Sequence, residues 1–318
     1  MSGTALNVLQ DKLVQSDCLL LDGALATELE ARGFDLADPL WSARVLLEAP
    51  QAIAQLHLDY LQAGADIITT SSYQASFEGF ARRGLDRQQA TGLMQLSVDL
   101  ALQARQRFMA EQPETATAPL VAASVGPYGA MLADGSEYRG DYGLSVTQLM
   151  DFHRPRLAVL AASGADLLAC ETIPCPEEAL ALARLLQEEF PATPAWISFS
   201  CRDAVRVWQG ERLADCITML DGVAQVVALG VNCTDPRWVE SLLRQAASVT
   251  SRPLLAYPNS GEQWDGQHKC WHGTASTADF SAQARRWRQA GARLIGGCCR
   301  TGPAHIAALR ACLDARGG

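Results

Sequence analysis

Short apolar runs alternate with amphipathic segments along the 318 residues of the chain. Eight of these runs are rich in leucine or β-branched residues and end in polar residues or glycine, which is typical of buried strands that stop at a loop. The predicted strands are Leu19–Asp22, Ile67–Ser72, Leu120–Val125, Leu167–Glu171, Trp196–Ser200, Val226–Cys233, Leu254–Tyr257 and Arg293–Cys298. Segments with helical spacing between them include Ala49–Ala63, Val146–Ala162, Glu177–Phe190, Arg237–Ala247 and Ala282–Ala290. This order predicts parallel β/α units.

The junction between helix and strand is repeated in the sequence. A helix end, a glycine and a buried strand follow one another at 63–68, 163–168 and 290–295. Glycine supplies the left-handed conformation that ends a helix, so the chain can turn directly into a strand. Eight such units predict a (β/α)8 TIM barrel of the α/β class, formed as a single domain by residues 1–318. An open doubly wound sheet is the alternative, although no glycine-rich dinucleotide-binding motif supports it.

The composition limits the partners of the protein. Hydrophobic residues make up 48% and charged residues 19% of the chain, as in an ordinary globular protein. The net charge of −9 and the pI of about 5.1 argue against a nucleic-acid surface, which needs a concentrated basic face. No segment predicts a membrane span, and Met1–Gln15 lacks the pattern of a secretory signal. We therefore expect a cytoplasmic monomer whose partners are small molecules.

Polar residues that close the predicted strands are candidates for chemistry, because the C-terminal ends of barrel strands carry the active site. Asp22 and Glu171 are carboxylates at the ends of apolar strands, where they could bind a substrate ammonium group. The alternative is that both form hydrogen bonds or ion pairs within the top of the barrel. Irregular connections that would surround the same face are Phe34–Trp41, Gly126–Tyr142, Arg202–Gly210 and Ser260–Thr274.

Three of the ten cysteines lie at the ends of predicted strands, namely Cys233 in Gly230–Cys233, and Cys298 with Cys299 in Gly296–Arg300. Closure of a barrel would bring these two distant stretches together, and three thiolates favour Zn²⁺ with one coordination position left open. Two alternatives remain. Cys233 could be a small buried apolar residue, and the adjacent cysteines could form a redox disulfide. The other cysteines are expected to be structural, and no histidine is chosen as a ligand.

These motifs occur together in a known family. The other stretches that carry the resemblance are Leu21–Ala24, Gly64–Asp66, Ser124–Gly129, Glu171–Thr172 and Tyr257–Gly261. The chain resembles the homocysteine S-methyltransferases essentially end to end, and most closely their bacterial members that use S-methylmethionine. The resemblance implies one Zn²⁺ per chain held by Cys233, Cys298 and Cys299, and an ammonium site at Asp22 and Glu171. Further residues expected to bind homocysteine are Gly23, Ala24, Thr70 and Asn232.

The implied reaction is attack of the homocysteine thiolate on an electrophilic methyl group, which gives methionine and requires no protein nucleophile. S-methylmethionine or S-adenosylmethionine fits as the donor, because a sulfonium is electrophilic by itself. Family members that use betaine have an aromatic side chain where this chain has Gln74. Aromatic residues expected near a cationic donor are Trp41, Tyr73, Phe77, Tyr128 and Tyr142.

Two other functions stay open. The same zinc site could methylate a related thiol or a selenol such as selenocysteine. The protein could also be a non-catalytic zinc-binding module, but a closed structural zinc site needs four protein ligands and the sequence offers three at telling positions.

Overall fold

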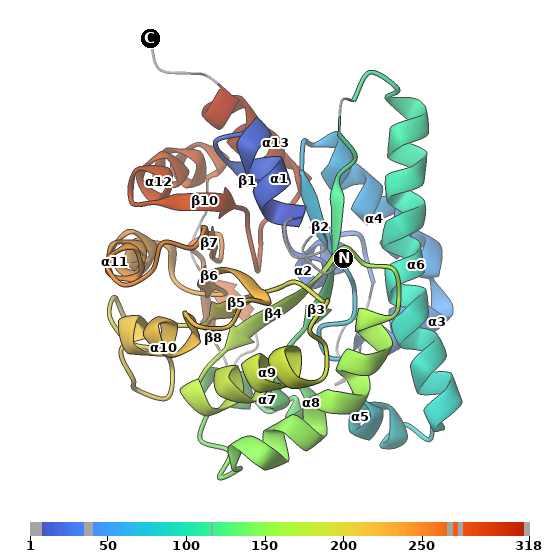
Figure 1. Cartoon of the computed structure of the whole chain (residues 1–318). Coiled ribbons are helices and arrows are strands. Elements are labelled where there is room, and N and C mark those ends of the chain that lie inside the picture. Colours follow the sequence, from blue (N-terminus) through green and yellow to red (C-terminus); the bar gives the residue numbers. More distant parts are fainter. Residues whose placement is uncertain (1–7, 35–40, 116, 266–269, 273–275, 315–318) are drawn as a thin grey trace.

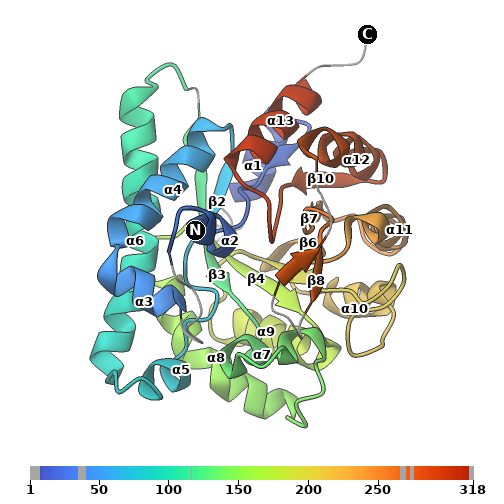
Figure 2. The same cartoon turned by 180° about the vertical axis from the view of Figure 1, so that it is seen from behind.

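A computed structural model describes residues 8–34, 41–115, 117–265, 270–272 and 276–314. Within these residues, eight parallel strands form a central barrel (Figures 1 and 2). The strands are β1 (Leu19–Leu20), β2 (Ile67–Thr69), β3 (Leu120–Val125), β4 (Leu167–Ile173), β5 (Ala195–Phe199), β6 (Val226–Asn232), β7 (Leu254–Tyr257) and β10 (Ala292–Ile295). Their pairing order is β1-β10-β7-β6-β5-β4-β3-β2, and a parallel bridge between Leu21 and Ile67 joins the two ends. The predicted (β/α)8 barrel is confirmed, and the open doubly wound sheet is wrong.

Helices surround the barrel in an outer layer (Figure 1). The covering helices are α4 (Pro50–Gln62), α6 (Arg87–Glu111), α8 (Val146–Ala161), α9 (Pro176–Glu188), α10 (Leu213–Leu220), α11 (Pro236–Ala247), α12 (Thr277–Gln289) and α13 (Pro303–Asp314). The remaining helices are α1 (Val8–Gln15), α2 (Ala26–Ala31), α3 (Trp41–Glu48), α5 (Phe77–Ala81), α7 (Tyr128–Leu132) and the 3₁₀ helix η2 (Ser136–Tyr138). In the described ranges, no helix is long and apolar enough to cross a membrane.

The alternation of side chains along each strand decides which residues reach the barrel interior. On β4, Leu167 and Ala169 belong to the inner apolar cluster, and Glu171 follows with the same parity. On β3, Ser124 holds the corresponding place after an apolar start. Inward-pointing positions therefore change from apolar to polar toward the C-terminal ends of the strands.

Helix α1 closes the opposite end of the barrel. Its Leu9 and Leu13 join the inner apolar cluster, and Lys12 donates a hydrogen bond to Thr117, just before β3. Apolar side chains therefore fill this end of the barrel, whereas the polar ones lie at the C-terminal ends of the strands.

Several predicted strands end earlier than expected. The first ends at Leu20 instead of Asp22, the second at Thr69 instead of Ser72, and the last at Ile295, before its two glycines. At the first two strands, the side chain of Asp22 takes part in the hydrogen bonding where the strands end. The Asp22 carboxylate accepts the backbone N–H of Thr69 at 2.7 Å, in the place of a carbonyl from a neighbouring strand.

Three of the predicted irregular connections contain regular elements. Gly126–Tyr142 includes α7 and η2, and Ser260–Thr274 includes the antiparallel strands β8 (Gln263–Asp265) and β9 (Cys270–His272). Trp41 in Phe34–Trp41 is the first residue of α3, whereas residues 35–40, 266–269 and 273–275 lie outside the described residues. These elements are too short to show a hydrophobic period in the sequence.

Candidate active site

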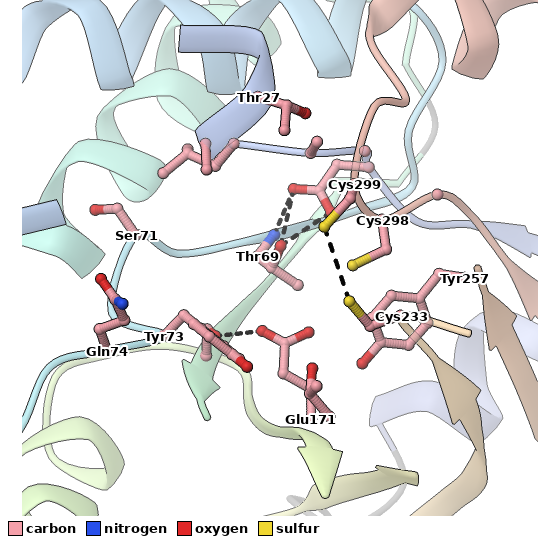
Figure 3. A pocket seen from close by; sticks show the side chains of 18 of the residues that line it. Thr27, Thr69, Ser71, Tyr73, Gln74, Glu171, Cys233, Tyr257, Cys298 and Cys299 are labelled. Carbon is pink, nitrogen blue, oxygen red and sulfur yellow. Dashed lines mark hydrogen bonds between the residues drawn. The ribbon is translucent and has the colours of Figure 1, made fainter. Parts of the chain in front are cut away.

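A pocket of about 240 Å³ lies at the C-terminal ends of the barrel strands (Figure 3). Asp22, Glu171, Cys233, Cys298 and Cys299 all line it. These residues follow or belong to β1, β4, β6 and β10, which are far apart in the sequence. The structure therefore brings together both the thiols and the carboxylates that the strand ends singled out.

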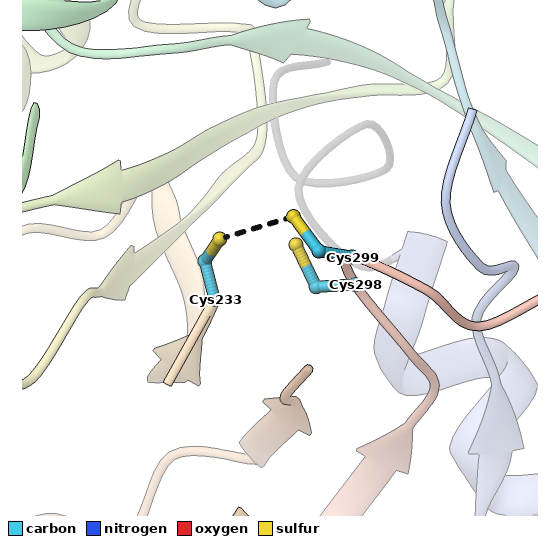
Figure 4. Close-up of side chains that lie close together, drawn as sticks. All are labelled: Cys233, Cys298 and Cys299. Atoms are coloured by element: carbon cyan, nitrogen blue, oxygen red, sulfur yellow. Dashed lines mark hydrogen bonds between the residues drawn. The ribbon is translucent and has the colours of Figure 1, made fainter. Parts of the chain in front are cut away.

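The three cysteines approach one another from two segments (Figure 4). Cys233 directly follows β6, whereas Cys298 and Cys299 follow β10 and two glycines. Their sulfur atoms all lie within 4.8 Å of one another, and the Cys233 and Cys299 sulfurs are 3.8 Å apart. In the described part of the chain this is the one group of three or more His, Cys, Asp and Glu side chains with metal-binding spacing.

The proton distribution among these sulfurs is uneven. Hydrogen bonds from Cys233 and Cys298 lower the pKa of Cys299 well below its ordinary value. The same contacts, together with burial, raise the pKa of Cys298. One thiolate is thus stabilised by two neighbouring thiols, and a soft cation would favour ionisation of all three.

Close packing explains the glycine pair before Cys298. A Cβ on Gly296 would lie 2.6 Å from Leu21 Cβ, and one on Gly297 would lie 2.1 Å from Thr301 Oγ1. The backbone N–H of Cys298 donates to Pro258 O at 2.8 Å. The close approach of this segment to Leu21 and Thr301 therefore requires glycine at both positions.

Asp22 lies at the wall of the pocket and is buried. It accepts hydrogen bonds from Thr69 N at 2.7 Å and Thr69 Oγ1 at 3.0 Å. Burial raises the pKa of the Asp22 carboxyl to about 8, and the nearby Glu171 charge acts in the same direction. Among the described residues that line the pocket with Asp22, none is a lysine, arginine or histidine.

Glu171 is the second buried carboxyl group of the pocket. Burial raises its pKa to about 7, although a short hydrogen bond donated by Ser124 Oγ to Glu171 Oε1 opposes this shift. Glu171 is followed by Thr172, whose φ of 61° is unusual for a β-branched residue. At this point, between Cys170 and Ile173, the register of β4 and β5 shifts.

Asn232 maintains this irregular backbone. Its Oδ1 accepts the N–H of Thr172 at 2.7 Å and the hydroxyl of Ser198 at 2.9 Å, and its Nδ2 donates to Thr172 Oγ1 at 2.8 Å. Asn232 is fully buried and does not line the pocket. The structure thus places its amide against Thr172, the residue that follows Glu171, and not on the pocket wall.

The other residues expected to bind homocysteine do line the pocket, but several of their polar groups already have partners. Ala24 N donates to Thr301 O at 2.8 Å, and Ala24 O accepts the hydroxyl of Tyr60 at 2.7 Å. The hydroxyl of Thr70 accepts the N–H of Ser124 at 3.0 Å. Gly23 packs so closely against Thr301 that a Cβ there would lie 2.4 Å from its carbonyl oxygen.

Comparison with known proteins now decides the family. Residues 19–313 match the family described as homocysteine S-methyltransferase, which is most of the chain. The chain belongs to the homocysteine S-methyltransferase family. Homocysteine S-methyltransferase of Escherichia coli (strain K12) is 53% identical over 309 residues, which are 96% of this chain and 98% of that protein. Selenocysteine Se-methyltransferase of Brassica oleracea var. italica is 46% identical over 308 residues, which are 93% of this chain and 89% of that protein.

A solved structure extends the likeness to three dimensions. The metallated form of the homocysteine methyltransferase MmuM from Escherichia coli has a TM-score of 0.87 and 51% sequence identity, and the match covers 97% of this chain and 99% of that chain. As a member of the homocysteine S-methyltransferase family, this chain is an enzyme that methylates homocysteine.

Tyr73 lines the pocket of this family member. The other aromatic residues that were expected near the donor and whose side chains are described do not line it, namely Phe77, Tyr128 and Tyr142. Tyr128 packs edge-on against Tyr142 and Phe152, with ring centroids 5.3 and 5.0 Å away. The guanidinium carbon of Arg87 lies over the ring of Phe77, 4.3 Å from the centroid of that ring. The side chain of Trp41 lies outside the described residues.

The structure also adds two residues to the homocysteine S-methyltransferase pocket that the sequence did not single out. Glu137 and Tyr138 belong to η2 and line the cavity, and the Tyr138 hydroxyl is 3.1 Å from the sulfur of Cys233. Burial raises the pKa of Glu137 to about 7. Both residues lie in the predicted irregular connection Gly126–Tyr142, far along it from the end of the preceding strand. The only sequence signal for them was the presence of acidic and tyrosine residues in that connection.

Proposed function

We propose that this family member is a zinc-dependent enzyme that transfers a methyl group from a sulfonium donor to the thiolate of L-homocysteine and forms methionine. One observation carries the proposal. Three cysteine sulfurs within 4.8 Å of one another share a pocket with two buried carboxyl groups, Asp22 and Glu171. A thiol and an ammonium group of one small amino acid can be held together there.

The donor set fits Zn²⁺. Tetrahedral zinc with Zn–S bonds of about 2.3 Å requires sulfur atoms about 3.8 Å apart. The Cys233 and Cys299 sulfurs have this separation of 3.8 Å, and Cys298 completes a trio within 4.8 Å. We propose one zinc per chain, held by these three residues, with a fourth position for the substrate. When bound, zinc would lower the pKa of the homocysteine thiol and orient its sulfur.

The two carboxyl groups are suited to the homocysteine ammonium group. A buried carboxylate without a counter-charge is costly, which is why the pKa values of Asp22 and Glu171 are raised to about 8 and about 7. An ammonium group between them would supply the missing charge and return both to the ionised form. Ser124 orients Glu171, and Thr69 orients Asp22, so the pair is positioned before the substrate binds.

The proposed transfer is balanced without a protein nucleophile. The homocysteine thiolate attacks a methyl carbon, a new carbon–sulfur bond forms, and the old carbon–sulfur bond breaks with its electron pair returning to the donor sulfur. With S-methylmethionine as the donor, both products are methionine. S-adenosylmethionine supplies the same sulfonium chemistry, and Tyr73 is an aromatic residue on the cavity wall that could contact either cation.

A selenol acceptor is the second candidate function. The selenocysteine Se-methyltransferase that is 46% identical to this chain favours it, because a selenol differs from a thiol by one atom. A non-catalytic zinc-binding module would need a fourth protein ligand. A cytoplasmic monomer that forms one domain and binds neither nucleic acid nor a membrane remains our expectation.

The deciding experiment is an assay for methionine. The purified, zinc-loaded protein is incubated with homocysteine and, in separate reactions, with S-methylmethionine, S-adenosylmethionine or betaine. We expect methionine with the sulfonium donors, and most with S-methylmethionine. If neither S-methylmethionine nor S-adenosylmethionine yields methionine, the proposed sulfonium donor is refuted. Replacement of homocysteine by selenocysteine tests the second candidate function.

Zinc analysis tests the ligand set independently of activity. Cys298→Ser should lose most of the one zinc per chain. Cys312→Ser is the matched control, because Cys312 lies on α13 outside the pocket and should keep its zinc. Equal zinc contents in the two variants would contradict the assignment.

A further inference from the structure

The pocket wall carries more acidic side chains than the ammonium group of homocysteine requires. Three carboxyl groups line it, those of Asp22, Glu171 and Glu137. Among the described residues that form this wall, none is a lysine, arginine or histidine. The proposed function uses Asp22 and Glu171 for one ammonium group, which leaves Glu137 without a role.

Glu137 is placed close to the sulfur cluster. Its neighbour on η2, Tyr138, brings a hydroxyl group to 3.1 Å from Cys233 Sγ. The Oε2 atom of Glu137 is buried and has no hydrogen-bond partner among the described residues. A buried carboxylate oxygen without a partner is costly, and a cation that enters the cavity would remove this cost.

The backbone around Glu137 is held firmly. The N–H of Ser136 donates to Asp134 Oδ1 at 2.9 Å, and Arg139 donates to the hydroxyl of Ser136 at 2.7 Å. A Cβ on Gly129 would lie 2.3 Å from Glu137 N, so α7 and η2 are in close contact. The backbone that carries Glu137 is therefore positioned before a ligand binds.

We propose that Glu137 is the counter-charge of the methyl donor, and that the site it forms with Tyr73 and Tyr138 selects a cationic sulfonium over a neutral ligand of the same shape. This inference rests on the proposed function, and it names the residue that recognises the donor. The two tyrosines line the same cavity, where their rings can contact a methylated cation.

The charge of the donor disappears during the reaction. The attacking thiolate is negative and the sulfonium positive, and both products are neutral thioethers. Glu137 therefore attracts the bound donor more strongly than the transition state, in which the charge is partly lost. Its removal should raise the KM for the donor far more than it lowers kcat. The neutral product is no longer held by Glu137, which favours its exchange for a new cation.

Binding without homocysteine tests the inference directly. Calorimetry on the zinc-loaded protein compares S-methylmethionine with 2-amino-5-methylhexanoate, in which a neutral CH group replaces the sulfonium sulfur. We expect the wild type to prefer the sulfonium by about tenfold or more, as one charged contact is worth 1.4 kcal/mol or more. Glu137→Gln should lose most of this preference and bind the neutral ligand as before.

Matched variants separate a charge effect from a structural one. Asp141→Asn removes a carboxylate from the same connection, but Asp141 is exposed and does not line the pocket, so the preference should persist. Glu137→Asp keeps the charge and draws it back by one methylene, so the sulfonium should bind several-fold more weakly than to the wild type and the neutral ligand equally well. Glu137→Asp also tests the inference if the Glu137→Gln variant is unstable.

Three results would overturn the inference: a wild type without preference, an unchanged preference in Glu137→Gln, or equal weakening of both ligands in Glu137→Asp. Steady-state kinetics adds a second readout, since Glu137→Gln should raise the donor KM and leave the homocysteine KM and zinc content unchanged. The two proposals fail separately. Selective sulfonium binding without methionine formation would refute only the methyl transfer, and methionine formation with full preference in Glu137→Gln would refute only the role of Glu137.

Discussion

At the scale of single residues, the site consists of side chains that are costly to bury unless a ligand is bound. Asp22 and Glu171 line the same pocket with raised pKa values, and no basic side chain lines it with them among the described residues. Both carboxyl groups are held by hydroxyl or amide donors, which fix their direction without neutralising their charge. Such groups stabilise a bound cation more than they stabilise the empty fold.

Glu171→Gln should weaken homocysteine binding. The amide keeps the size of the side chain and can still accept from Ser124, but it has no charge for the ammonium group. A charge-assisted hydrogen bond is worth about 1.5–3 kcal/mol, so the KM for homocysteine should rise by roughly tenfold to a hundredfold. Zinc content should not change, because the cysteines are untouched.

The same substitution on the exposed surface of α9, Glu188→Gln, is the control and should behave as the wild type. Steady-state kinetics with varied homocysteine gives the comparison. An unaltered KM in Glu171→Gln would remove Glu171 from the substrate site.

At the scale of elements, short segments between the strands position the residues that the strands do not carry. The connection after β3 folds into α7 and η2, and their close contact at Gly129 sets the place of Glu137 and Tyr138. The irregular end of β4 has a comparable role for Glu171, with Asn232 as its support. The barrel supplies the frame, and these irregular segments complete the pocket.

Gly129→Ala should displace η2. The new Cβ would lie 2.3 Å from Glu137 N and 2.5 Å from Ser136 C, which are backbone atoms that cannot rotate away. We expect a loss of about 1–3 kcal/mol of stability and a several-fold higher KM for the sulfonium donor. Urea unfolding and donor kinetics measure the two effects.

Gly92→Ala on α6 provides the control, because no atom lies within 4 Å of the added Cβ. It should stabilise the helix by about 0.5–1 kcal/mol and leave the donor KM unchanged. If both alanine variants raised the donor KM equally, the contact between α7 and η2 would not be the cause.

At the scale of the whole molecule, stability should depend on pH through the buried carboxyl groups. Burial raises the pKa of Asp22 from 3.8 to about 8, so the folded protein keeps this proton between those pH values and the unfolded chain releases it. The folded state then binds the additional proton. Its stability consequently falls as the pH rises through this window and is level above it.

Asp22→Asn should gain stability relative to the wild type as the pH rises from about 4 to about 8, by at most about 1.4 kcal/mol per pH unit. The asparagine oxygen can still accept the N–H of Thr69, and the amide has no proton to lose. Urea unfolding of both proteins after chelation of metal measures the gap, that is, the difference between their free energies of unfolding, at several pH values. A gap that stays constant or narrows with pH would contradict the raised pKa.

Much of the architecture could be predicted because the residues within each strand or helix, and those next to it, indicate that element. The apolar runs around Ile67 and Leu167 and the glycines that precede them are signals within a few residues, and parallel β/α units have few ways to close. Strand ends then singled out Asp22, Glu171 and Cys233, because a barrel places its chemistry at one end of the strands.

The rest depended on contacts between distant segments. The sequence predicted Tyr128 and not Tyr138 near the donor, yet Tyr128 packs against Phe152 and Tyr138 reaches Cys233. Nothing local distinguishes them, because the direction of each ring follows from how α7 and η2 pack. Asn232 was likewise expected at the substrate, whereas its amide is occupied by Thr172.

By itself, the sequence determined the order of strands and helices, the family and the residues that end the strands, since these follow from local periodicity and from motifs of adjacent residues. Only the tertiary structure decided that three sulfurs meet within 4.8 Å and that Glu137 shares their pocket. The physical reason is that burial and distance arise when the barrel closes. The same closure removes water from the carboxyl groups and raises their pKa values.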